Sequence, residues 1–479
     1  MGTLVRGCPH HIGATVTAPD AARPPEQSHD TNIWKVAAAS FIGTAVEWYD
    51  FFLYGTAAAL IFNRLFFPSF DPLVGTLAAF ATFAVGFVAR PLGGIIFGHF
   101  GDKLGRKSML SATLMIMGVA TFAIGLLPTY ERIGVWAPIL LVVLRILQGF
   151  GLGGEWGGAV LMAVEHAPAH RRGFYGSWPQ MGAPAGLLVA NAVFSIFSRL
   201  PEEQFVSWGW RVPFLFSAVL IGIGVFIRHS VAESPAFRAH QAQAAATQAS
   251  ASSGAKLPAL EALRTYPRQI LLAMGARFAE NGFFYIVTTF VLTYGTGQLK
   301  LERSTMLTAV LGATAVHLLV IPAFGALSDV LGRRPVYLGG AVGCAVLAFP
   351  FFWLLDTQST GLIWLAITLG IIAHAAMYGP QASFFSELFG TRVRYSGASL
   401  GYQLASVFAG GLSPLIATAL LTESGGKSWP VSLYMVVLAL ITLVSVYLSA
   451  ETFREHLTES TSTAPTGGAV GTGEKREVA

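Results

Sequence analysis

The feature that constrains this sequence most is its series of apolar runs, each close to the ~20 residues that an α-helix needs to cross the hydrocarbon core of a membrane. Hydrophobic residues make up 53% of the chain and charged residues only 11%, whereas about a quarter of the residues of a soluble domain are charged. The sequence therefore predicts an all-α membrane protein with twelve transmembrane helices. The runs, with ends accurate to a few residues, are 34–62, 73–100, 108–128, 136–161, 174–198, 210–228, 269–295, 304–327, 335–355, 361–386, 395–421 and 430–450.

Two short polar segments between these runs share the pattern G-x-x-x-D-x-x-G-R-[KR], which places Asp102 and Asp329 at the same position in each. A repeated pattern at matching places indicates a duplicated unit, so the twelve helices form two six-helix halves. Composition separates the halves from flexible segments. The predicted regions are a disordered cytoplasmic leader (1–32), a first half (33–228), a cytoplasmic link (229–267), a second half (268–452) and a disordered cytoplasmic tail (453–479).

The repeated segment has the chemistry of a gate between the two halves. Its glycines allow a sharp turn and a close approach of two helices, and its Asp and basic residues can form charge-assisted contacts. Such contacts would hold one conformation until the halves move. The alternative is an ordinary basic loop on the cytoplasmic side. The predicted gate residues are Gly98, Asp102, Gly105, Arg106, Lys107, Asp329, Arg333 and Arg334.

The basic residues indicate how the chain lies in the membrane. Lys and Arg gather in the loops between runs 2 and 3, 4 and 5, 8 and 9, and 10 and 11, so we expect a multi-pass protein of the cell (inner or plasma) membrane with both termini cytoplasmic. The same excess explains the pI of about 9.2 without a nucleic-acid partner. The expected partners are the lipid bilayer, protons and a small-molecule substrate, and we expect a monomer to be functional.

The first span carries the clearest candidates for proton coupling. Ionisable residues within a span are costly and tend to face a cavity or a partner. Glu47, Asp50 and Tyr54 lie within about 60° of one another on a helix and form one polar stripe. Two carboxylates one turn apart repel in a low dielectric, which favours protonation of one of them. Glu47 and Asp50 are the predicted proton-coupling residues; the alternative is that one acid only pairs with an arginine to lock two helices.

A fixed cation in the fourth span is the first candidate for substrate binding. Arg145 stays charged at physiological pH, so either a substrate carboxylate or Asp50 would have to neutralise it, and competition between the two would couple substrate to proton. Neutral donors and acceptors in other spans suit a hydroxylated acid. The predicted substrate-binding residues are Tyr54, Arg145, Gln148, Gln180, Asn191, Glu280, His374, Gln381 and Gln403.

Other buried polar groups are assigned structural roles. Arg90 is assigned to helix contacts because it lies shortly before the first gate segment. Arg277 and Glu280 are one turn apart and can neutralise each other, and His317 is interpreted as a packed or hydrogen-bonded histidine. The sequence shows no metal-ligand cluster, nucleophile and base set or phosphate loop at credible spacing. We therefore expect no metal, no cofactor, no enzymatic activity and no ATP-driven pumping.

Several motifs resemble those of known families. The repeated gate pattern is similar to the loop signature of the major facilitator superfamily, and RILQG (145–149) is similar to a fourth-span signature of its proton symporters. A second set together resembles the metabolite:proton symporter family: EWYDFFLYG (47–55), RPLGG (90–94), QGFGLGGEWGG (148–158), WGWRVPF (208–214) and ESPAF (233–237). The segments most similar to the shikimate-carrying branch of that family are 63–68, 75–83, 394–398 and 401–403.

The resemblance implies the twelve-helix facilitator fold and a secondary active transporter that imports a small organic acid, shikimate-like or dicarboxylate, by proton symport with alternating access. Two alternatives stay open. One is a proton-coupled importer of a zwitterion such as proline or betaine, for which Trp48, Tyr54, Trp156 and Trp178 would form an aromatic cage. The other is a uniporter of the same fold, in which Asp50 has no coupling role.

Overall fold

The computed structural model describes residues 2, 33–104, 106–153, 160, 163–164, 167–230, 263–389 and 394–453. In these ranges the chain is almost entirely helical and contains no β-strand. The described residues from Ile33 onward belong to one unit. The predicted leader, the centre of the predicted link and nearly all of the predicted tail lie outside the described residues, so the predicted regions stay predictions.

The described residues of the first half form six long helices, and each matches one predicted apolar run. Between them lie the short helices α2 (Phe62–Phe66), α5 (Tyr130–Ile133) and α9 (Glu202–Gln204), the 3₁₀ turn η1 (Ala169–Arg171) and the π-helical turn η2 (Phe205–Gly209). The long helices are α1 (Ile33–Leu60), α3 (Pro72–Leu104), α4 (Arg106–Leu126), α6 (Trp136–Leu152), α8 (Arg172–Phe197) and α10 (Arg211–Ser230).

The second half repeats this order, but two of its spans contain π-helical turns. The first span runs through α13 (Pro267–Tyr285), η3 (Ile286–Phe290), α14 (Val291–Thr293) and η4 (Tyr294–Gln298), and the fifth through α18 (Arg394–Ala405), η5 (Ser406–Gly411) and α19 (Leu412–Glu423). The remaining spans are α15 (Arg303–Leu331), α16 (Arg333–Asp356), α17 (Thr360–Glu387) and α20 (Trp429–Leu448). Together the two halves place a helix at each of the twelve predicted runs.

Length and apolar composition suit these helices to a membrane. Eight described segments pass as membrane-crossing helices, and the bent pair Glu202–Gly209 and Arg211–Phe226 makes a ninth. Shorter apolar helices cover Ser111–Leu126 in α4 and Trp136–Leu152 in α6. The 28 residues of α1 would extend about 42 Å at ~1.5 Å per residue, which exceeds the ~30 Å hydrocarbon core.

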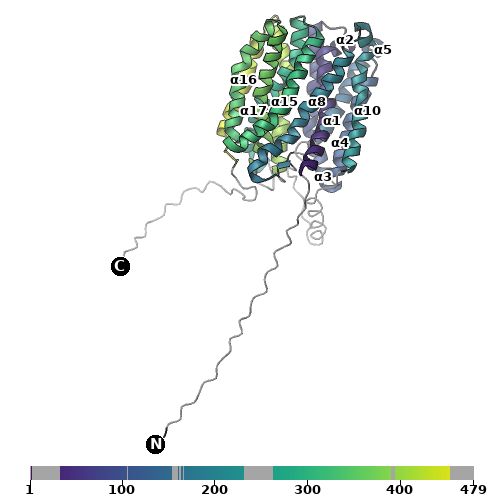
Figure 1. Ribbon diagram of the computed structural model, residues 1–479. Coiled ribbons are helices and arrows are strands. Elements are labelled where there is room, and N and C mark those ends of the chain that lie inside the picture. Colours follow the sequence, from purple (N-terminus) through teal and green to yellow (C-terminus); the bar gives the residue numbers. More distant parts are fainter. Residues whose placement is uncertain are drawn as a thin grey trace. The chain divides into compact units, whose positions relative to one another are not determined.

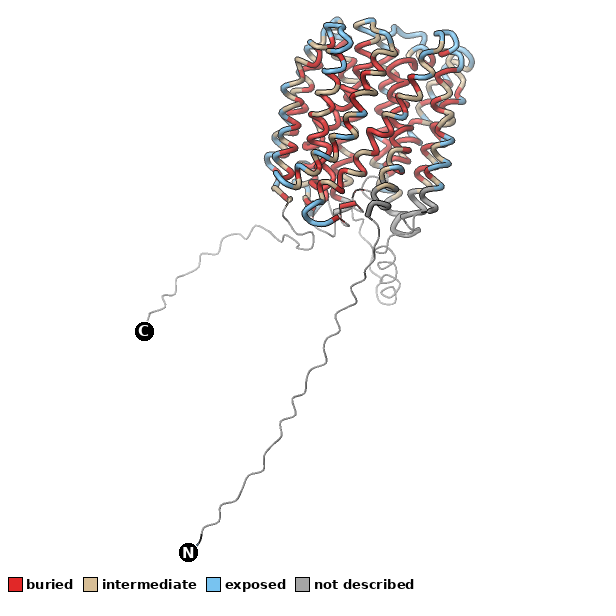
Figure 2. Tube along the Cα trace, viewed as in Figure 1, coloured by how far each residue is buried: buried red, intermediate tan, exposed pale blue. Residues whose placement is uncertain are grey.

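The outward-facing sides of the helices are exposed and apolar, while the buried residues lie between the helices (Figure 2). Phe226, Leu319 and Val330 are each more than 70% exposed, at 73%, 75% and 74%. A soluble protein rarely exposes so much apolar surface. Lipid tails cover such a surface at no cost, and the helical backbone satisfies its own hydrogen bonds there.

Glycines bring α3 and α6 into backbone contact. A Cβ atom on Gly149 would lie 1.9 Å from the carbonyl oxygen of Gly86, and one on Gly153 would lie 2.0 Å from the carbonyl oxygen of Arg90. Small residues at a helix crossing allow this approach within a membrane. The contact brings Arg90 of α3 and Arg145 of α6 into the same part of the first half.

The two halves meet along several helices of the described part. In Figure 1 the first-half helices, purple to teal, stand beside the green to yellow helices of the second half, with α8 next to α15. Helix α8 packs against α1 in its own half and against α15 and α17 in the other. Helix α3 packs against α18, η5 and α19. These contacts enclose the polar residues described next.

Candidate functional site

The first cavity lies between the two halves. Its walls combine acidic, basic, amide and aromatic side chains, which is the composition of a site for a small polar ligand. The lining residues are Thr44, Glu47, Trp48, Arg90, Leu152, Val160, Pro179 and Gln180 from the first half and Tyr378, Tyr402 and Gln403 from the second.

Arg90 provides the positive charge of this cavity. Its guanidinium carbon lies 4.0 Å from the ring centre of Phe51 and 4.2 Å from that of Phe87. The side chain is 1% exposed, and its Nε and Nη2 atoms have no hydrogen-bond partner. No carboxylate of the described residues lies within ion-pair distance of it. A buried cation without a counter-ion is costly, so this position suits an anionic ligand.

The assignment of Arg90 to helix contacts was therefore incomplete. Its carbonyl oxygen does contact Gly153, directly after α6, but its guanidinium lines the cavity. The sequence shows that Arg90 lies near a gate segment, but it does not show in which direction the side chain points.

Arg145 lies behind an aromatic wall instead of on the cavity surface. Its guanidinium carbon is 4.0 Å from the ring centre of Phe51, 4.3 Å from that of Tyr54 and 4.7 Å from that of Phe83. Its Nη1 donates to Gln148 Oε1 at 3.1 Å, and its Nε and Nη2 have no partner. The predicted substrate-binding residues Tyr54, Arg145 and Gln148 line neither described cavity.

Polar contacts behind this wall involve four helices of the first half. Gln148 Nε2 donates to Thr121 Oγ1 on α4 at 2.7 Å, and Tyr54 Oη and Thr82 Oγ1 on α3 share a hydrogen bond of 2.6 Å. Both hydrogen bonds lie beside Arg145, since Gln148 accepts from its guanidinium and the ring of Tyr54 lies against it. The arrangement holds that charge in place.

The two predicted proton-coupling acids lie in different surroundings. Glu47 lines the first cavity. Asp50 is 1% exposed and points toward α4, where a Cβ atom on Gly118 would lie 3.6 Å from its Oδ2 atom. Neither carboxylate oxygen of Asp50 has a hydrogen-bond partner. The expected neutralisation of Arg145 by Asp50 is not seen, since no ion pair joins them in the described structure.

A second cavity adjoins the first and shares Trp48, Tyr378 and Tyr402 with it. Aromatic rings from both halves and a charged cluster of the second half form its walls. The lining residues are Trp48, Phe52, Ala183, Pro184, Arg277, Glu280, Asn281, Phe284, Tyr285, His317, His374, Tyr378 and Tyr402.

The charged cluster is tightly connected. Glu280 Oε2 lies 3.5 Å from Arg277 Nη1 and accepts from Gln381 Nε2 at 2.9 Å, while Glu280 Oε1 lies 3.3 Å from His374 Nε2. Arg277 Nη1 also donates to Gln381 Oε1 at 3.2 Å. The predicted pairing of Arg277 with Glu280 is confirmed. His317, interpreted as a hydrogen-bonded histidine, shares a 2.9 Å hydrogen bond with His374.

Three amide side chains predicted at the site have different positions. Gln180 Nε2 reaches across to Gln381 Oε1 at 3.3 Å and the Tyr378 carbonyl at 3.4 Å, and Gln403 Nε2 donates to the Gly153 carbonyl at 3.0 Å. Both therefore bridge the halves beside the first cavity. Asn191 accepts a hydrogen bond from Thr56 within the first half and lines neither cavity.

The predicted aromatic cage is not assembled in the described structure. Trp48 lines both cavities, but Tyr54 lies behind the wall and Trp178 packs its ring 6.2 Å from that of Phe174. Trp156 lies outside the described residues. Sequence alone did not show that these rings belong to different layers of the first half.

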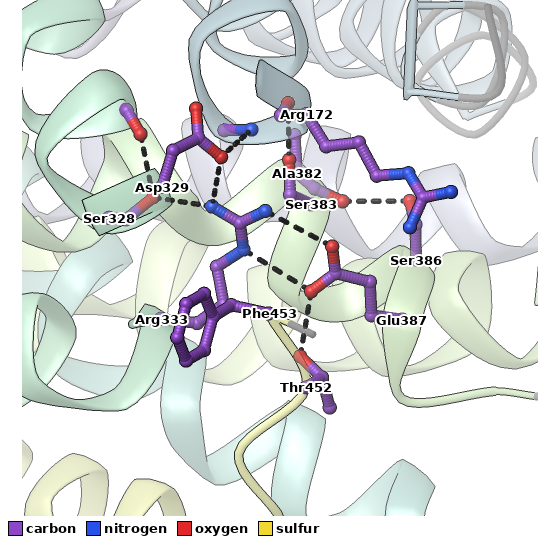
Figure 3. A network of polar contacts seen from close by, with 12 residues as sticks. Arg172, Ser328, Asp329, Arg333, Ala382, Ser383, Ser386, Glu387, Thr452 and Phe453 are labelled. Carbon is purple, nitrogen blue, oxygen red and sulfur yellow. Dashed lines mark hydrogen bonds and ion pairs between the residues drawn. The ribbon is translucent and has the colours of Figure 1, made fainter. Parts of the chain in front are cut away.

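The second gate segment joins the two halves through Asp329 (Figure 3). The Asp329 carboxylate accepts the backbone N–H groups of Gly173 at 2.8 Å and Phe174 at 2.9 Å, at the N-terminus of α8. An anion is favoured at this end of a helix. Arg333 forms ion pairs with Asp329 at 2.7 Å and with Glu387 at 3.2 Å, and both arms are visible in Figure 3.

The gate pattern folds as helix, glycine and helix, not as the polar loop predicted from sequence. Gly332 alone separates α15 from α16, and its φ of +103° is a conformation that favours glycine. Arg334 continues α16 and donates to the carbonyls of Val446 and Tyr447. In the first copy Gly98 and Asp102 belong to α3, and Arg106 and Lys107 to α4; Gly105 lies outside the described residues.

The halves also meet at the opposite end of the bundle. Thr293 Oγ1 donates to the Ala59 carbonyl at 3.2 Å, and Arg303 of α15 lies 3.6 Å from Glu202, which also pairs with Arg64. Contacts between halves therefore lie at both ends, with the two cavities between them.

Solved structures of transporters share this arrangement. The crystal structure of a D-xylose-proton symporter aligns with a TM-score of 0.67 over 88% of this chain and 99% of that one, at 19% sequence identity. A partially occluded inward-open structure of the xylose transporter XylE from E. coli aligns with a TM-score of 0.66 over 89% and 99%, at 20% identity. The described part of this chain therefore has the same fold as these proteins.

Sequence comparison defines the family. Residues 35–463 match the family described as sugar (and other) transporter. The shikimate transporter of Escherichia coli K12 is 46% identical over 422 residues, covering 88% of this chain and 95% of that protein. The proline/betaine transporter of the same strain is 36% identical over 437 residues, covering 91% and 87%. The chain belongs to the sugar (and other) transporter family, which confirms the predicted superfamily and a transporter instead of an enzyme.

Proposed function

We propose that this protein imports a small hydroxylated organic acid, shikimate or a close analogue, in symport with protons. It would do so as a monomer in the inner (plasma) membrane, with both termini cytoplasmic. The observation that carries this proposal is the buried Arg90 guanidinium, which lines the cavity between the halves with two nitrogen atoms unpartnered. The 46% identity to a shikimate transporter supports the choice of substrate.

The walls around Arg90 fit the rest of such a substrate. Gln180 and Gln403 present amides, and Tyr378 and Tyr402 present aromatic rings with hydroxyl groups. A carboxylate on the guanidinium would form charge-assisted hydrogen bonds, while ring hydroxyls would bond to the amides. Trp48 offers an apolar face to the carbon ring.

Asp50 and Glu47 are the proposed proton-coupling acids of the first half. A buried carboxylate without a partner is costly as an anion, and binding a proton removes that cost. Asp50 meets this description because both of its oxygens are buried and unpartnered. Glu47 lies on the cavity wall, where its charge would respond to a bound anion.

We propose that the contacts between the halves at the two ends of the bundle act as gates to these sites. Asp329 and Arg333 would hold one end closed, and the Thr293 and Arg303 contacts would hold the other. Alternating access requires that only one set separates at a time. Substrate and proton would shift the balance between the two sets by binding the cavities between them.

The test is uptake of labelled shikimate into proteoliposomes with an inward proton gradient. Accumulation above the external concentration that an uncoupler abolishes is the expected result. We expect Arg90→Ala to lower the uptake rate about 100-fold, because losing a buried charge pair costs about 2–5 kcal/mol, and Arg199→Ala, at an exposed arginine, to leave it unchanged. Mere equilibration of shikimate would favour a uniporter.

A zwitterion such as proline or glycine betaine is the second candidate. The aromatic rings of Trp48, Phe52, Phe284 and Tyr285 in the second cavity favour it, because such rings attract quaternary ammonium groups. Voltage separates the candidates: a monoanion with one proton moves no net charge, whereas a zwitterion with one proton gains about 2.3 kcal/mol per 100 mV. Uptake of labelled glycine betaine that rises with an inside-negative potential would favour this alternative.

A further inference from the structure

A row of three titratable side chains crosses the second half. His317 on α15, His374 on α17 and Glu280 on α13 are 0%, 2% and 3% exposed. His317 Nε2 lies 2.9 Å from His374 Nδ1, and His374 Nε2 lies 3.3 Å from Glu280 Oε1. The residues at the two ends of the row, His317 and Glu280, both line the second cavity.

The hydrogen bonds fix the positions of the protons along this row. Glu280 is paired with Arg277 and therefore accepts, so His374 must donate from Nε2. A neutral imidazole that donates from Nε2 accepts at Nδ1. His317 must then donate from Nε2 to His374, which leaves His317 Nδ1 as a bare acceptor. That atom is buried and has no hydrogen-bond partner.

We propose that His317 Nδ1 receives a proton from the second cavity and that the row passes a proton to Glu280. His317 binds the incoming proton at Nδ1 and gives its Nε2 proton to His374 Nδ1. His374 then gives its Nε2 proton to Glu280 Oε1. One proton has entered, both rings are neutral with their tautomers reversed, and Glu280 is a neutral acid.

Protonation of Glu280 removes the counter-ion of Arg277. In the structure its positive charge is balanced by Glu280 at 3.5 Å, and its guanidinium lies over the Tyr402 ring, 3.1 Å from the centre. Once Glu280 is neutral, Arg277 needs another anion. Because Arg277 and Tyr402 line the second cavity and Tyr402 also lines the first, a substrate carboxylate can supply that charge.

This exchange couples one proton to one anion. Arg277 and Glu280 together carry no net charge before loading, and Arg277, neutral Glu280 and a bound carboxylate carry none afterwards. An anion without the proton would leave one uncompensated buried negative charge, which is costly. The inference rests on the proposed proton symport of an organic acid and adds a second proton-binding site to Asp50.

The other groups that face the row do not supply a competing charge. Tyr337 and Cys344 approach from α16, Tyr378 lies beside His374 on α17, and Tyr402 comes from α18. Tyrosine and cysteine side chains are ordinarily neutral near pH 7. The first half faces the second cavity with Trp48, Phe52, Ala183 and Pro184, none of which titrates. Arg90 of the first half is a cation, and it repels Arg277.

The test compares driven accumulation with exchange for His317→Gln. The glutamine amide can still donate toward His374 but binds no proton. With an inward pH gradient of one unit and no voltage, wild-type proteoliposomes should accumulate labelled shikimate about tenfold, as one proton per anion requires. His317→Gln should reach about onefold, and shikimate exchange should fall with it, because the anion binds only after the row has delivered its proton to Glu280. His170→Gln, at an exposed histidine, is the matched control.

A substrate-free measurement keeps the two proposals separate. Infrared difference spectra of the reconstituted protein on lowering the pH should show a protonated-carboxyl band that Glu280→Gln removes, that His317→Gln prevents and that His170→Gln retains. Equal bands in wild type and His317→Gln, or tenfold accumulation by His317→Gln, would overturn the inference. If wild type does not accumulate shikimate, the proposed function fails, and the infrared result alone then decides whether the row carries protons.

Discussion

The buried charges of the two halves are arranged in opposite ways. In the first half Arg90, Arg145 and Asp50 are buried, and none of the three forms an ion pair in the described structure. In the second half Arg277, Glu280 and His374 are joined by contacts of 3.3 to 3.5 Å. The first half thus leaves these buried charges without ion pairs, whereas the second half neutralises its buried charges within one ion-paired cluster.

The difference suggests that the two halves have different roles in binding an anion. A cation without an ion-pair partner, such as Arg90, can bind an anionic ligand without breaking an existing ion pair. A cation that is already paired, such as Arg277, can bind a ligand anion only after its partner Glu280 has been protonated. The first half would therefore supply constant attraction for an anion, and the second half would make tight binding depend on a proton.

The largest expected effect comes from breaking the ion pair of the second half. Arg277→Gln leaves Glu280 buried without its cation and should lower the free energy of unfolding by about 3–5 kcal/mol. The double variant Arg277→Gln/Glu280→Gln should recover most of that loss, since both charges are then gone. Denaturant unfolding of the purified protein, read as a double-mutant cycle, measures both. Additive losses would show that the two residues do not stabilise each other.

A smaller effect tests whether the second half also controls the contact between halves. Asp329→Asn weakens the bonds to the Gly173 and Phe174 amides, because an ionised acceptor binds roughly twice as strongly as a neutral one. Maleimide labelling of a cysteine introduced by Ser177→Cys, a buried position on α8, should become about tenfold faster, equivalent to about 1.4 kcal/mol. Glu131→Gln at the exposed α5 is the control. Equal rates in both backgrounds would remove Asp329 from the gate.

The smallest effect is expected in the first half. Asp50 forms no ion pair in the described structure and interacts with the Thr121 hydroxyl, so Asp50→Asn should change the unfolding free energy by less than about 1 kcal/mol while it abolishes gradient-driven accumulation of shikimate. Unfolding and uptake measured on the same preparation separate the two effects. A loss of several kcal/mol would reveal a structural partner for Asp50 and would remove the contrast between the halves.

Helix positions could be predicted from sequence because the signal is local. The run predicted at 361–386 became α17 (Thr360–Glu387), and the run predicted at 174–198 became α8 (Arg172–Phe197). An apolar stretch of membrane-crossing length specifies a helix whatever its neighbours are. The gate turn was misjudged because a single residue, Gly332, is sufficient to separate two helices when its φ is positive.

Side-chain partners were harder to predict because they depend on which helices meet. Arg90 and Arg145 look alike in sequence, and only the packing of α3 against α6 and α1 places one on the cavity and the other behind Phe51. His317 and His374 lie on different helices, so no spacing rule joins them. Arg277 and Glu280 were predictable as a pair because they are one helical turn apart.

The most direct test of the account measures proton and substrate entry together. Proteoliposomes held at zero voltage receive labelled shikimate, and the rate of external alkalinisation is recorded alongside the rate of uptake. We expect about one proton per shikimate in wild type, with no current, because the charges of the anion and the proton cancel. Shikimate uptake without alkalinisation would contradict the coupled entry of one anion with one proton.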